Sequence, residues 1–249
     1  MTFKVFIDFE STGLSTLNDE IVQIGAVGVK DDGKCEISKF KTNVFTERKI
    51  NIHASRVTGI TNETIQNAPN KKKSFEMLFK WINDNRAGED VVFIAYNGIR
   101  FDFKMFYHEM KRIKLDPQGE WNKISLKFFL DPFVWAKNHM NKSKLVRKKN
   151  GMCSYCLIDI HKALLGKCFE NAHDALCDTF ALYDICMHEN FSEMTSDSEN
   201  IHCIPVDKFV KNMNTIKIKK RKAPMKCQTI METFSKKKKA KKDIKTKQN

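Results

Sequence analysis

Three strand-like segments follow one another at the start of the chain before any helical pattern appears. They are Phe3–Phe9, Ile21–Val29 and Cys35–Thr42, and a turn sequence at 31–33 separates the last two. Strands joined by such short connections are expected to lie side by side and antiparallel. Because an antiparallel start limits the sheets that the rest of the chain can complete, this order constrains the fold more than any single motif.

Helical and strand-like patterns alternate in the following part of the chain. The spacing of apolar residues predicts helices over Ser74–Asn85, Phe101–Ile113, Cys156–Leu165 and Ala172–Met187, and strands over Val91–Ala95 and Ser125–Leu130. Val91–Ala95 is wholly apolar, as expected of a strand buried on both faces. The order predicts an α/β fold of three layers, in which helices flank a central mixed sheet of five strands.

The net charge of +14 is concentrated near the end of the chain. Residues 1–200 contain 28 Lys and Arg against 27 Asp and Glu, whereas residues 201–249 contain 16 against 3. We therefore predict a folded domain over 1–191 and a basic, largely disordered tail over 192–249. Such a tail should stay solvated and bind a polyanion, with nucleic acid as the leading candidate and a nuclear-import or solubility role as the alternative.

The eight cysteines follow no signal-peptide pattern, so we expect an intracellular protein with reduced thiols. No apolar run approaches the roughly 20 residues that span a bilayer, so no membrane partner is expected. Cys153 and Cys156, with His161 and Cys168 nearby, leave a zinc site open. The alternative is small residues around a helix start, because a second well-spaced pair of ligands is missing.

Two carboxylates share one face of the first predicted strand. Side chains alternate along a strand, so Asp8 and Glu10 lie together while Ile7 and Phe9 lie on the other face. Neighbouring carboxylates repel each other unless a hard divalent cation lies between them. Gly13 then permits a sharp turn or a close approach of a ligand to the backbone. The segment indicates a metal site, and an exposed acidic edge is the alternative.

A further acidic residue, Asp102, follows the buried strand Val91–Ala95. It ends the sequence Asn97-Gly98-Ile99-Arg100-Phe101-Asp102, at a strand end where α/β sheets usually present their sites. Asp102 also begins the next predicted helix, so it could belong to a site or simply cap that helix.

The third acidic position, Asp178, lies within the last predicted helix. His173 precedes it by five positions, which is about 140° around an ideal helix. The two side chains cannot face one atom from the middle of a helix, so His173 belongs at the helix start or on the preceding loop. A metal ligand and a general base need such a separation, whereas a surface histidine is the alternative.

Together these pieces resemble the DnaQ-like (DEDDh) 3′–5′ exonucleases, a family of ribonuclease H-like fold. The shared order is Asp-x-Glu, then Asp, then His-x4-Asp, and further segments are similar at Asp19–Ala26, Val57–Thr61 and Gly166–Asp178. The resemblance covers about residues 3–188. The spacing from Asn97 to Asp102 is most similar to the three-prime repair exonuclease branch.

The resemblance implies a two-metal hydrolysis that releases 5′-mononucleotides from a 3′ end. Asp8, Glu10 and Asp178 would hold one Mg²⁺ ion, and Asp8 and Asp102 would hold the second, with Mn²⁺ as a substitute. His173 would accept a proton from the attacking water. The residues expected to hold the terminal nucleotides are Ser11, Thr12, Gly13, Leu14, Asn97 and Phe101. Ser11 stands where family members often carry Thr.

An acidic pocket would repel a phosphate unless cations are present, so the near-neutral domain depends on metal ions and on Lys and Arg elsewhere. The basic loop Lys142–Lys149 is a candidate clamp on a nucleic-acid backbone, and a solvated loop is the alternative.

Two segments of the tail resemble known targeting and binding sequences. Lys217–Lys222 resembles a nuclear-localisation signal, so we expect a nuclear protein. Gln228, Met231 and Phe234 resemble the peptide box that binds the eukaryotic-type sliding clamp, although Ser235 replaces its usual second aromatic residue. In a 3₁₀ turn Met231 and Phe234 would form one apolar plug. The alternative is an apolar island in a basic tail.

The leading prediction is therefore a metal-dependent exonuclease that acts on DNA 3′ ends in repair or proofreading. A related enzyme acting on RNA ends is one alternative. A catalytically idle adaptor that binds nucleic acid or the clamp is another, and the intact set of five site residues argues against it.

Overall fold

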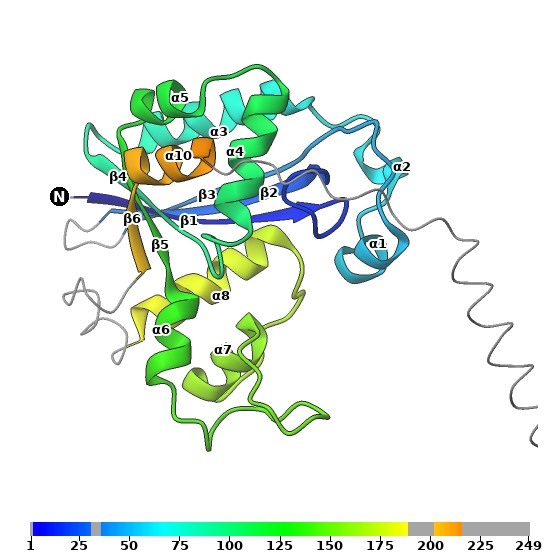
Figure 1. Cartoon of the computed structure of the whole chain (residues 1–249), viewed down its shortest axis with the longest axis vertical. Coiled ribbons are helices and arrows are strands. Elements are labelled where there is room, and N and C mark those ends of the chain that lie inside the picture. Colours follow the sequence, from blue (N-terminus) through cyan, green and yellow to red (C-terminus); the bar gives the residue numbers. More distant parts are fainter. Residues whose placement is uncertain (1, 31–35, 189–201, 216–249) are drawn as a thin grey trace, which may run out of the picture. The chain divides into compact units, whose positions relative to one another are not determined.

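The computed structural model describes residues 2–30, 36–188 and 202–215, which form a mixed sheet with helices on both faces (Figure 1). The strands are β1 (Thr2–Ser11), β2 (Ile21–Val29), β3 (Ile37–Asn43), β4 (Asp90–Ile94), β5 (Leu126–Asp131) and β6 (His202–Pro205). Their order in the sheet is β3-β2-β1-β4-β5-β6. The first three strands pair antiparallel, as their short connections predict, whereas β1, β4 and β5 run parallel to one another.

Among the described residues the sheet contains six strands, one more than the sequence analysis predicts. The additional strand, β6, pairs antiparallel with β5 from Phe128↔Pro205 to Asp131↔His202. It lies in a segment predicted to belong to a disordered tail. Four residues are too few to show a clear alternation, and the pairing with β5 depends on the fold of the rest of the chain.

Helices cover both faces of the sheet, which confirms the three-layer prediction (Figure 1). One layer contains α3 (Lys71–Asn85), α4 (Asp102–Arg112), α5 (Pro117–Lys123) and α10 (Val206–Thr215). The other contains α6 (Pro132–His139), α7 (Leu157–Leu165) and α8 (Ala175–Met187). Two short helices, α1 (Ile52–Thr58) and α2 (Asn62–Ile65), lie between β3 and α3.

The two faces of β1 pack against different layers. Val5, Ile7 and Phe9 belong to the core beneath α3 and α4, whereas Phe6 belongs to the core beneath α6, α7 and α8. All nine residues of β2 are buried, since it lies between β1 and β3 with helices on both sides. The alternation along β1 fixes which face receives each polar side chain near its end.

The folded unit extends to Met213, beyond the domain boundary predicted at residue 191. Val206, Phe209 and Met213 of α10 are buried, and the Phe209 ring centroid lies 4.9 Å from that of Phe129. The second unit begins at Asn214, and the tail sequences predicted to bind partners lie outside the described residues. Within the part of the chain that the structure describes, no helix is both long and apolar enough to cross a membrane.

Candidate active site

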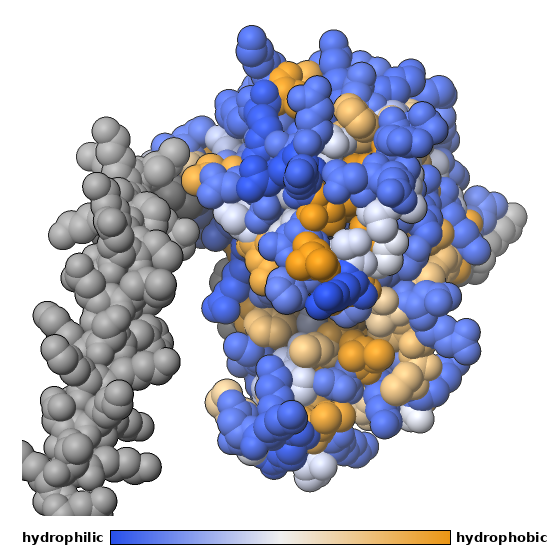
Figure 2. Space-filling view, turned by 90° about the vertical axis from the view of Figure 1, so that its right-hand side faces the viewer, coloured by the Kyte–Doolittle hydropathy of each residue, from blue (hydrophilic) through white to orange (hydrophobic). Residues whose placement is uncertain are grey.

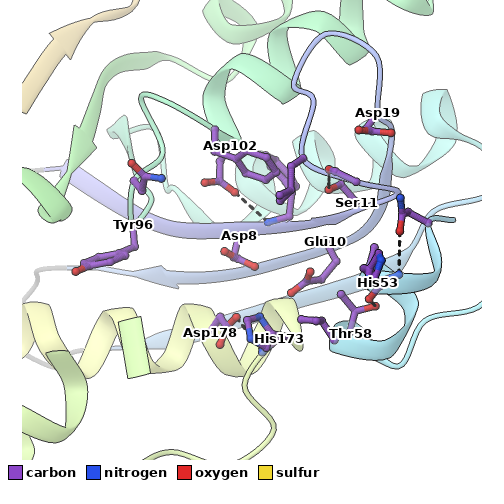
Figure 3. A pocket seen from close by; sticks show the side chains of 18 residues that line it. Asp8, Glu10, Ser11, Asp19, His53, Thr58, Tyr96, Asp102, His173 and Asp178 are labelled. Atoms are coloured by element: carbon purple, nitrogen blue, oxygen red, sulfur yellow. Dashed lines mark hydrogen bonds between the residues drawn. The ribbon is translucent and has the colours of Figure 1, made fainter. Parts of the chain in front are cut away.

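Asp8 and Glu10 lie on the face of β1 that packs against α8, as the strand alternation predicts (Figure 3). Asp8 is paired with Gly25 of β2, and Glu10 with Gln23. A Cβ atom on Gly25 would lie 2.2 Å from the carbonyl carbon of Ala175. The start of α8 therefore rests directly on β2, next to the two carboxylates.

A cavity of about 750 Å³ opens at this end of the sheet (Figure 3). Its walls come from the end of β1 and the following loop, from α1, from the loop between β4 and α4, and from the start of α8. All five residues predicted to be catalytic line it: Asp8, Glu10, Asp102, His173 and Asp178. The fold thus brings together side chains that are far apart in the sequence.

Asp102 is the first residue of α4 and is only 3% exposed. The backbone N–H of Phe9 donates to its Oδ1 at 3.3 Å. The N-cap position of α4 belongs to Phe101, whose side chain makes no capping hydrogen bond. The capping alternative for Asp102 is therefore wrong, and its carboxylate faces the cavity near Asp8 (Figure 3).

The loop between β4 and α4 is held by Asp131, a residue that the sequence analysis did not single out. Its carboxylate accepts hydrogen bonds from the backbone N–H groups of Asn97 at 2.7 Å and Ile99 at 3.2 Å. It also accepts from Phe133 at the start of α6. The sequence contained one signal that could have pointed to Asp131, because an acidic residue directly before a proline is typical of the start of a helix.

Asn97 lines the cavity with a backbone φ of 60°, in the left-handed region that Asn adopts more readily than most residues. Its buried Oδ1 has no hydrogen-bond partner among the described residues. A buried polar atom of this kind is costly unless it is satisfied, so this oxygen is available to a donor on a ligand.

His173 lies on the loop that precedes α8, where the five-residue spacing predicts it. Its side chain is exposed, and its backbone has a positive φ of 70°. The backbone N–H of His173 donates to Oδ2 of Asp178 at 3.1 Å. Asp174 caps the helix by accepting from the backbone N–H groups of Leu176 and Cys177.

Glu10, His173 and Asp178 form a cluster that could hold a metal ion. One ligand atom of each lies within 4.8 Å of the others. The predicted metal set contains Asp8 and Asp102 instead of His173, and these two carboxylates lie in the same cavity but outside this cluster. The cavity therefore contains more acidic ligands than a single cation requires.

Burial is the largest cause of a raised pKa at each of the four carboxyl groups. It raises the pKa of Glu10 to about 8, with added repulsion from Asp178 and Asp102. It raises the pKa of Asp102 to about 7 despite hydrogen bonds from backbone N–H groups, and that of Asp178 to about 6. The pKa of Asp8 lies well above its ordinary value, because burial and its four acidic neighbours, which include Asp174, all oppose ionisation. A divalent cation would relieve this repulsion, so the oxygen-rich donor set fits a hard ion.

Five of the six residues predicted to bind nucleotides line the cavity: Ser11, Gly13, Leu14, Asn97 and Phe101. Leu14 is 90% exposed. Thr12 is not among the lining residues. Its hydroxyl donates to Asp19 and accepts from the backbone N–H of Glu20, so it stabilises the loop that carries Gly13 and Leu14.

The cavity also contains residues that the sequence analysis did not assign to the site. Ala54, His53, Val57 and Thr58 come from α1, which has no buried residue of its own. A helix of seven residues is too short to show a clear periodicity, so the sequence pattern did not predict it. Tyr96 forms part of the opposite wall, and its hydroxyl donates to the backbone carbonyl of Tyr155 at 2.9 Å.

The basic loop Lys142–Lys149 has exposed Lys and Arg side chains, and Arg147 forms a β-bridge with Cys153. Cys153 is partly buried and Cys156 is exposed. Within residues 2–30, 36–188 and 202–215, the cluster at Glu10 is the only group of side chains close enough to hold a metal. The structure therefore gives no support to zinc at these cysteines.

The order of the mixed sheet and the acidic cavity at the end of its central strand agree with the ribonuclease H-like fold that the sequence predicts. The sequence model of the exonuclease family named RNase_T matches residues 5–186. The chain belongs to this exonuclease family, which confirms the DnaQ-like resemblance. The similarity to the three-prime repair branch stays a prediction.

The chain is similar to segments of longer proteins. DNA polymerase III PolC-type of Bacillus subtilis is 33% identical over 140 residues, which are 55% of this chain and 9% of that protein. The corresponding polymerase of Thermotoga maritima is 32% identical over 109 residues, which are 44% of this chain and 7% of that protein. The chloroplastic and mitochondrial exonuclease DPD1 of Arabidopsis thaliana is 24% identical over 168 residues, with 63% of this chain and 50% of that protein covered.

Among solved structures, E. coli Exonuclease I in complex with a dT13 oligonucleotide superposes with a TM-score of 0.63 and 18% identity. The match covers 79% of this chain and 43% of that protein. Its zinc-bound complex with single-stranded DNA superposes equally well, with a TM-score of 0.63. These likenesses establish the same fold.

Proposed function

We propose that this chain is a metal-dependent exonuclease that removes nucleotides from DNA 3′ ends and releases 5′-mononucleotides. The observation that carries the proposal is the convergence of four carboxylates and one histidine in a single cavity. Membership of the exonuclease family supports the reaction type. The DNA oligonucleotides in complex with E. coli Exonuclease I support DNA as the substrate class.

The carboxylates would hold two divalent ions, Mg²⁺ or in its place Mn²⁺. Asp8, Glu10 and Asp178 would bind one ion, and Asp8 would share the second with Asp102. Bound ions of this kind lower the pKa of a water molecule and neutralise charge on the phosphate during an in-line displacement. Burial and the repulsion between these carboxyl groups raise their pKa values, which supports the assignment, because bound cations would offset both effects.

His173 would accept the proton of the attacking water, which requires its neutral imidazole. Its place at the rim of the cavity supports this role, because an exposed side chain can pass the proton on to solvent. The side chains of Leu14 and Val57 are exposed and line the same cavity, so they would contact the terminal bases. Oδ1 of Asn97 would accept a hydrogen bond from the bound nucleotide.

The experiment that tests this function is digestion of oligonucleotides labelled at the 5′ end, with unlabelled products identified by chromatography. Single-stranded DNA should shorten stepwise from the 3′ end in Mg²⁺ or Mn²⁺, with release of 5′-mononucleotides and no activity in EDTA. The Asp8→Ala protein, with its other ligands intact, should be inactive. Internal cuts, or equal rates for the parent and Asp8→Ala, would contradict the proposal.

The same assay separates the substrate classes. A DNA enzyme should act on RNA more slowly by about tenfold or more, and a proofreading or repair enzyme should remove a mismatched 3′ nucleotide faster than a paired one. Faster digestion of RNA would favour the exoribonuclease alternative. A protein that binds DNA without shortening it would be the idle adaptor.

The tail proposals concern residues outside those that the structure describes. Lys217–Lys222 would direct nuclear import, and Gln228, Met231 and Phe234 would bind a sliding clamp. Phe234→Ala should weaken retention on immobilised clamp several-fold, because the aromatic anchor supplies most of the apolar contact. Equal retention of the parent and this variant would contradict the proposal that these residues bind a sliding clamp.

A further inference from the structure

The pairing of β1, β2 and β3 places two cross-strand rows of three residues each on the face beneath α8. Directly paired residues point to the same face of a sheet. Asp8 is opposite Gly25, and Gly25 is opposite Lys41. Glu10 is opposite Gln23, which is opposite Asn43. Each candidate metal ligand of β1 thus begins a row that continues across the sheet under the start of α8.

The row that begins at Glu10 holds the backbone of α8. Oε1 of Gln23 accepts a hydrogen bond from the backbone N–H of Ala175 at 3.0 Å. Its Nε2 donates to Oδ1 of Asn43 at 2.9 Å, which fixes the orientation of the amide. Gln23 is only 5% exposed, so loss of its acceptor would leave a buried N–H without a partner.

The row that begins at Asp8 holds the residue next to His173. Gly25 allows the backbone of α8 to touch the sheet, and the Lys41 ammonium group forms an ion pair with the Asp174 carboxylate. Asp174 in turn caps α8. Lys41 also offsets the charge of Asp174, which does not line the cavity.

The ion pair with Asp174 and the hydrogen bond from Ala175 hold the chain on both sides of the peptide bond that joins these two residues. His173 precedes that bond by one residue, and Asp178 follows one helical turn later. His173 itself is exposed, so packing of its own side chain cannot fix its place. The sheet therefore sets the position of this segment through the neighbouring residues.

We propose that Gln23 and Lys41 are positioning residues that fix the start of α8, and with it His173 and Asp178, relative to Asp8 and Glu10. Neither residue needs to touch the substrate. The inference rests on the proposed function, because the position of His173 and Asp178 matters only if they act in that site. It assigns a role in catalysis to the edge strand β3, which contributes no residue to the cavity.

Lys41→Met tests the proposal, and Lys39→Met is a matched control. Lys39 lies on the same strand and the same face two residues away, and its Nζ lies 4.8 Å from the centre of the Phe180 ring instead of near a carboxylate. Each variant removes one positive charge at nearly the same place. Lys41→Met should lower kcat by about tenfold with KM within twofold of the parent, because misplaced groups slow the chemical step.

Two further variants complete the set. Lys41→Arg should restore most of the rate, since it keeps the ion pair. Gln23→Leu should lower kcat by a similar factor through the other contact. Amide hydrogen exchange gives a readout that does not depend on activity: the amides of Ala175 and Leu176 should exchange at least several-fold faster in Lys41→Met than in Lys39→Met.

The outcomes separate this inference from the proposed function. Parent-like kcat and amide exchange in Lys41→Met would overturn the positioning role while the exonuclease assignment stands. A rise in KM alone would also overturn it, because it would indicate contact of Lys41 with nucleic acid. An equal loss in Lys39→Met would overturn it as well, because the ion pair with Asp174 would then not be the cause of the loss. Absence of nuclease activity in the parent would refute the proposed function, and amide exchange would then decide the positioning claim alone.

Discussion

At the scale of single residues, the cavity combines groups that repel one another. Asp8, Glu10, Asp102 and Asp178 come from three separate elements, and burial raises the pKa of each. Holding these four carboxyl groups together without cations lowers the stability of the folded protein, as is common at functional sites. Strand alternation predicted the placement of Asp8 and Glu10. The place of Asp102 in the site became clear only from the structure, because the sequence also allowed this residue to be a helix cap.

Removing one of these charges should stabilise the metal-free protein. In EDTA, Asp8→Asn should raise Tm by about 2–4 °C, because it relieves repulsion in the cavity. Addition of Mg²⁺ should raise the Tm of the parent and have much less effect on the variant. Thermal unfolding measures both, with the exposed Glu76→Gln as a control that changes neither. A parent Tm that does not respond to Mg²⁺ would contradict the metal assignment.

A second group of charges behaves in the opposite way. Burial alone would raise the pKa of Glu20, but hydrogen bonds from Lys71 and Thr46 and the charges of Lys71 and Arg112 hold it below its ordinary value. The ionised form therefore stabilises the fold. Its contribution is complete above the unfolded-state pKa of 4.5 and is lost as the pH falls through the lower folded-state pKa.

Glu20→Gln should accordingly lower the free energy of unfolding by about 1 kcal/mol at pH 7, a value typical of partly exposed ion pairs. The difference between the parent and this variant should shrink as the pH falls below 4.5. Urea unfolding across this range measures it. A difference that stays constant down to pH 2.5 would show that the ion pairs are not its source.

At the scale of elements, long segments with clear periodicity were predictable. The strands β1 to β5 and the helices α3, α4, α7 and α8 agree with the sequence patterns to within a few residues at their ends. The short helices α1, α2, α5 and α6 were missed, because four to eight residues carry too little periodic signal. The role of Asp131 was missed for another reason: its partners Asn97 and Ile99 are distant in the sequence, and only the parallel pairing of β4 with β5 brings them near.

The segment 202–215 illustrates how composition can mislead. A basic, polar stretch predicted disorder, yet Val206, Phe209 and Met213 have helical spacing and complete the core over β5. Phe209→Ala should lower the free energy of unfolding by about 3–4 kcal/mol, because it leaves a cavity beside Trp121 and Phe129. Chemical denaturation measures the change. A loss below about 1 kcal/mol would mean that α10 is not part of the cooperative core, and the exposed Lys208→Ala is the control.

At the scale of the whole molecule, charge and chemistry are separated along the chain. Residues 216–249 contain 14 of the 44 Lys and Arg residues, whereas the acidic cavity belongs to the compact unit that ends at Met213. We expect the tail to contribute to affinity for nucleic acid and the cavity to perform the reaction. The two functions should be separable by truncation.

Deletion of residues 216–249 should flatten the dependence of DNA binding on salt, because fewer counterions are released from the DNA. The kcat for release of the terminal nucleotide should remain within about twofold of the parent, since the truncation keeps α10 and the core. Fluorescence anisotropy at several salt concentrations measures the slope. An unchanged slope would show that the tail does not contact DNA.

The central claim is that Asp8, Glu10, Asp102, His173 and Asp178 act as one metal-dependent catalytic unit. The most direct test is the rate of mononucleotide release from single-stranded DNA by the parent, Asp178→Asn, His173→Ala and the double variant in Mg²⁺. Each single variant should lose at least about a hundredfold, and the double variant should be hardly slower than the worse single one, because residues of one unit are not additive. A parent-like rate for Asp178→Asn, or losses that multiply in the double variant, would contradict the account.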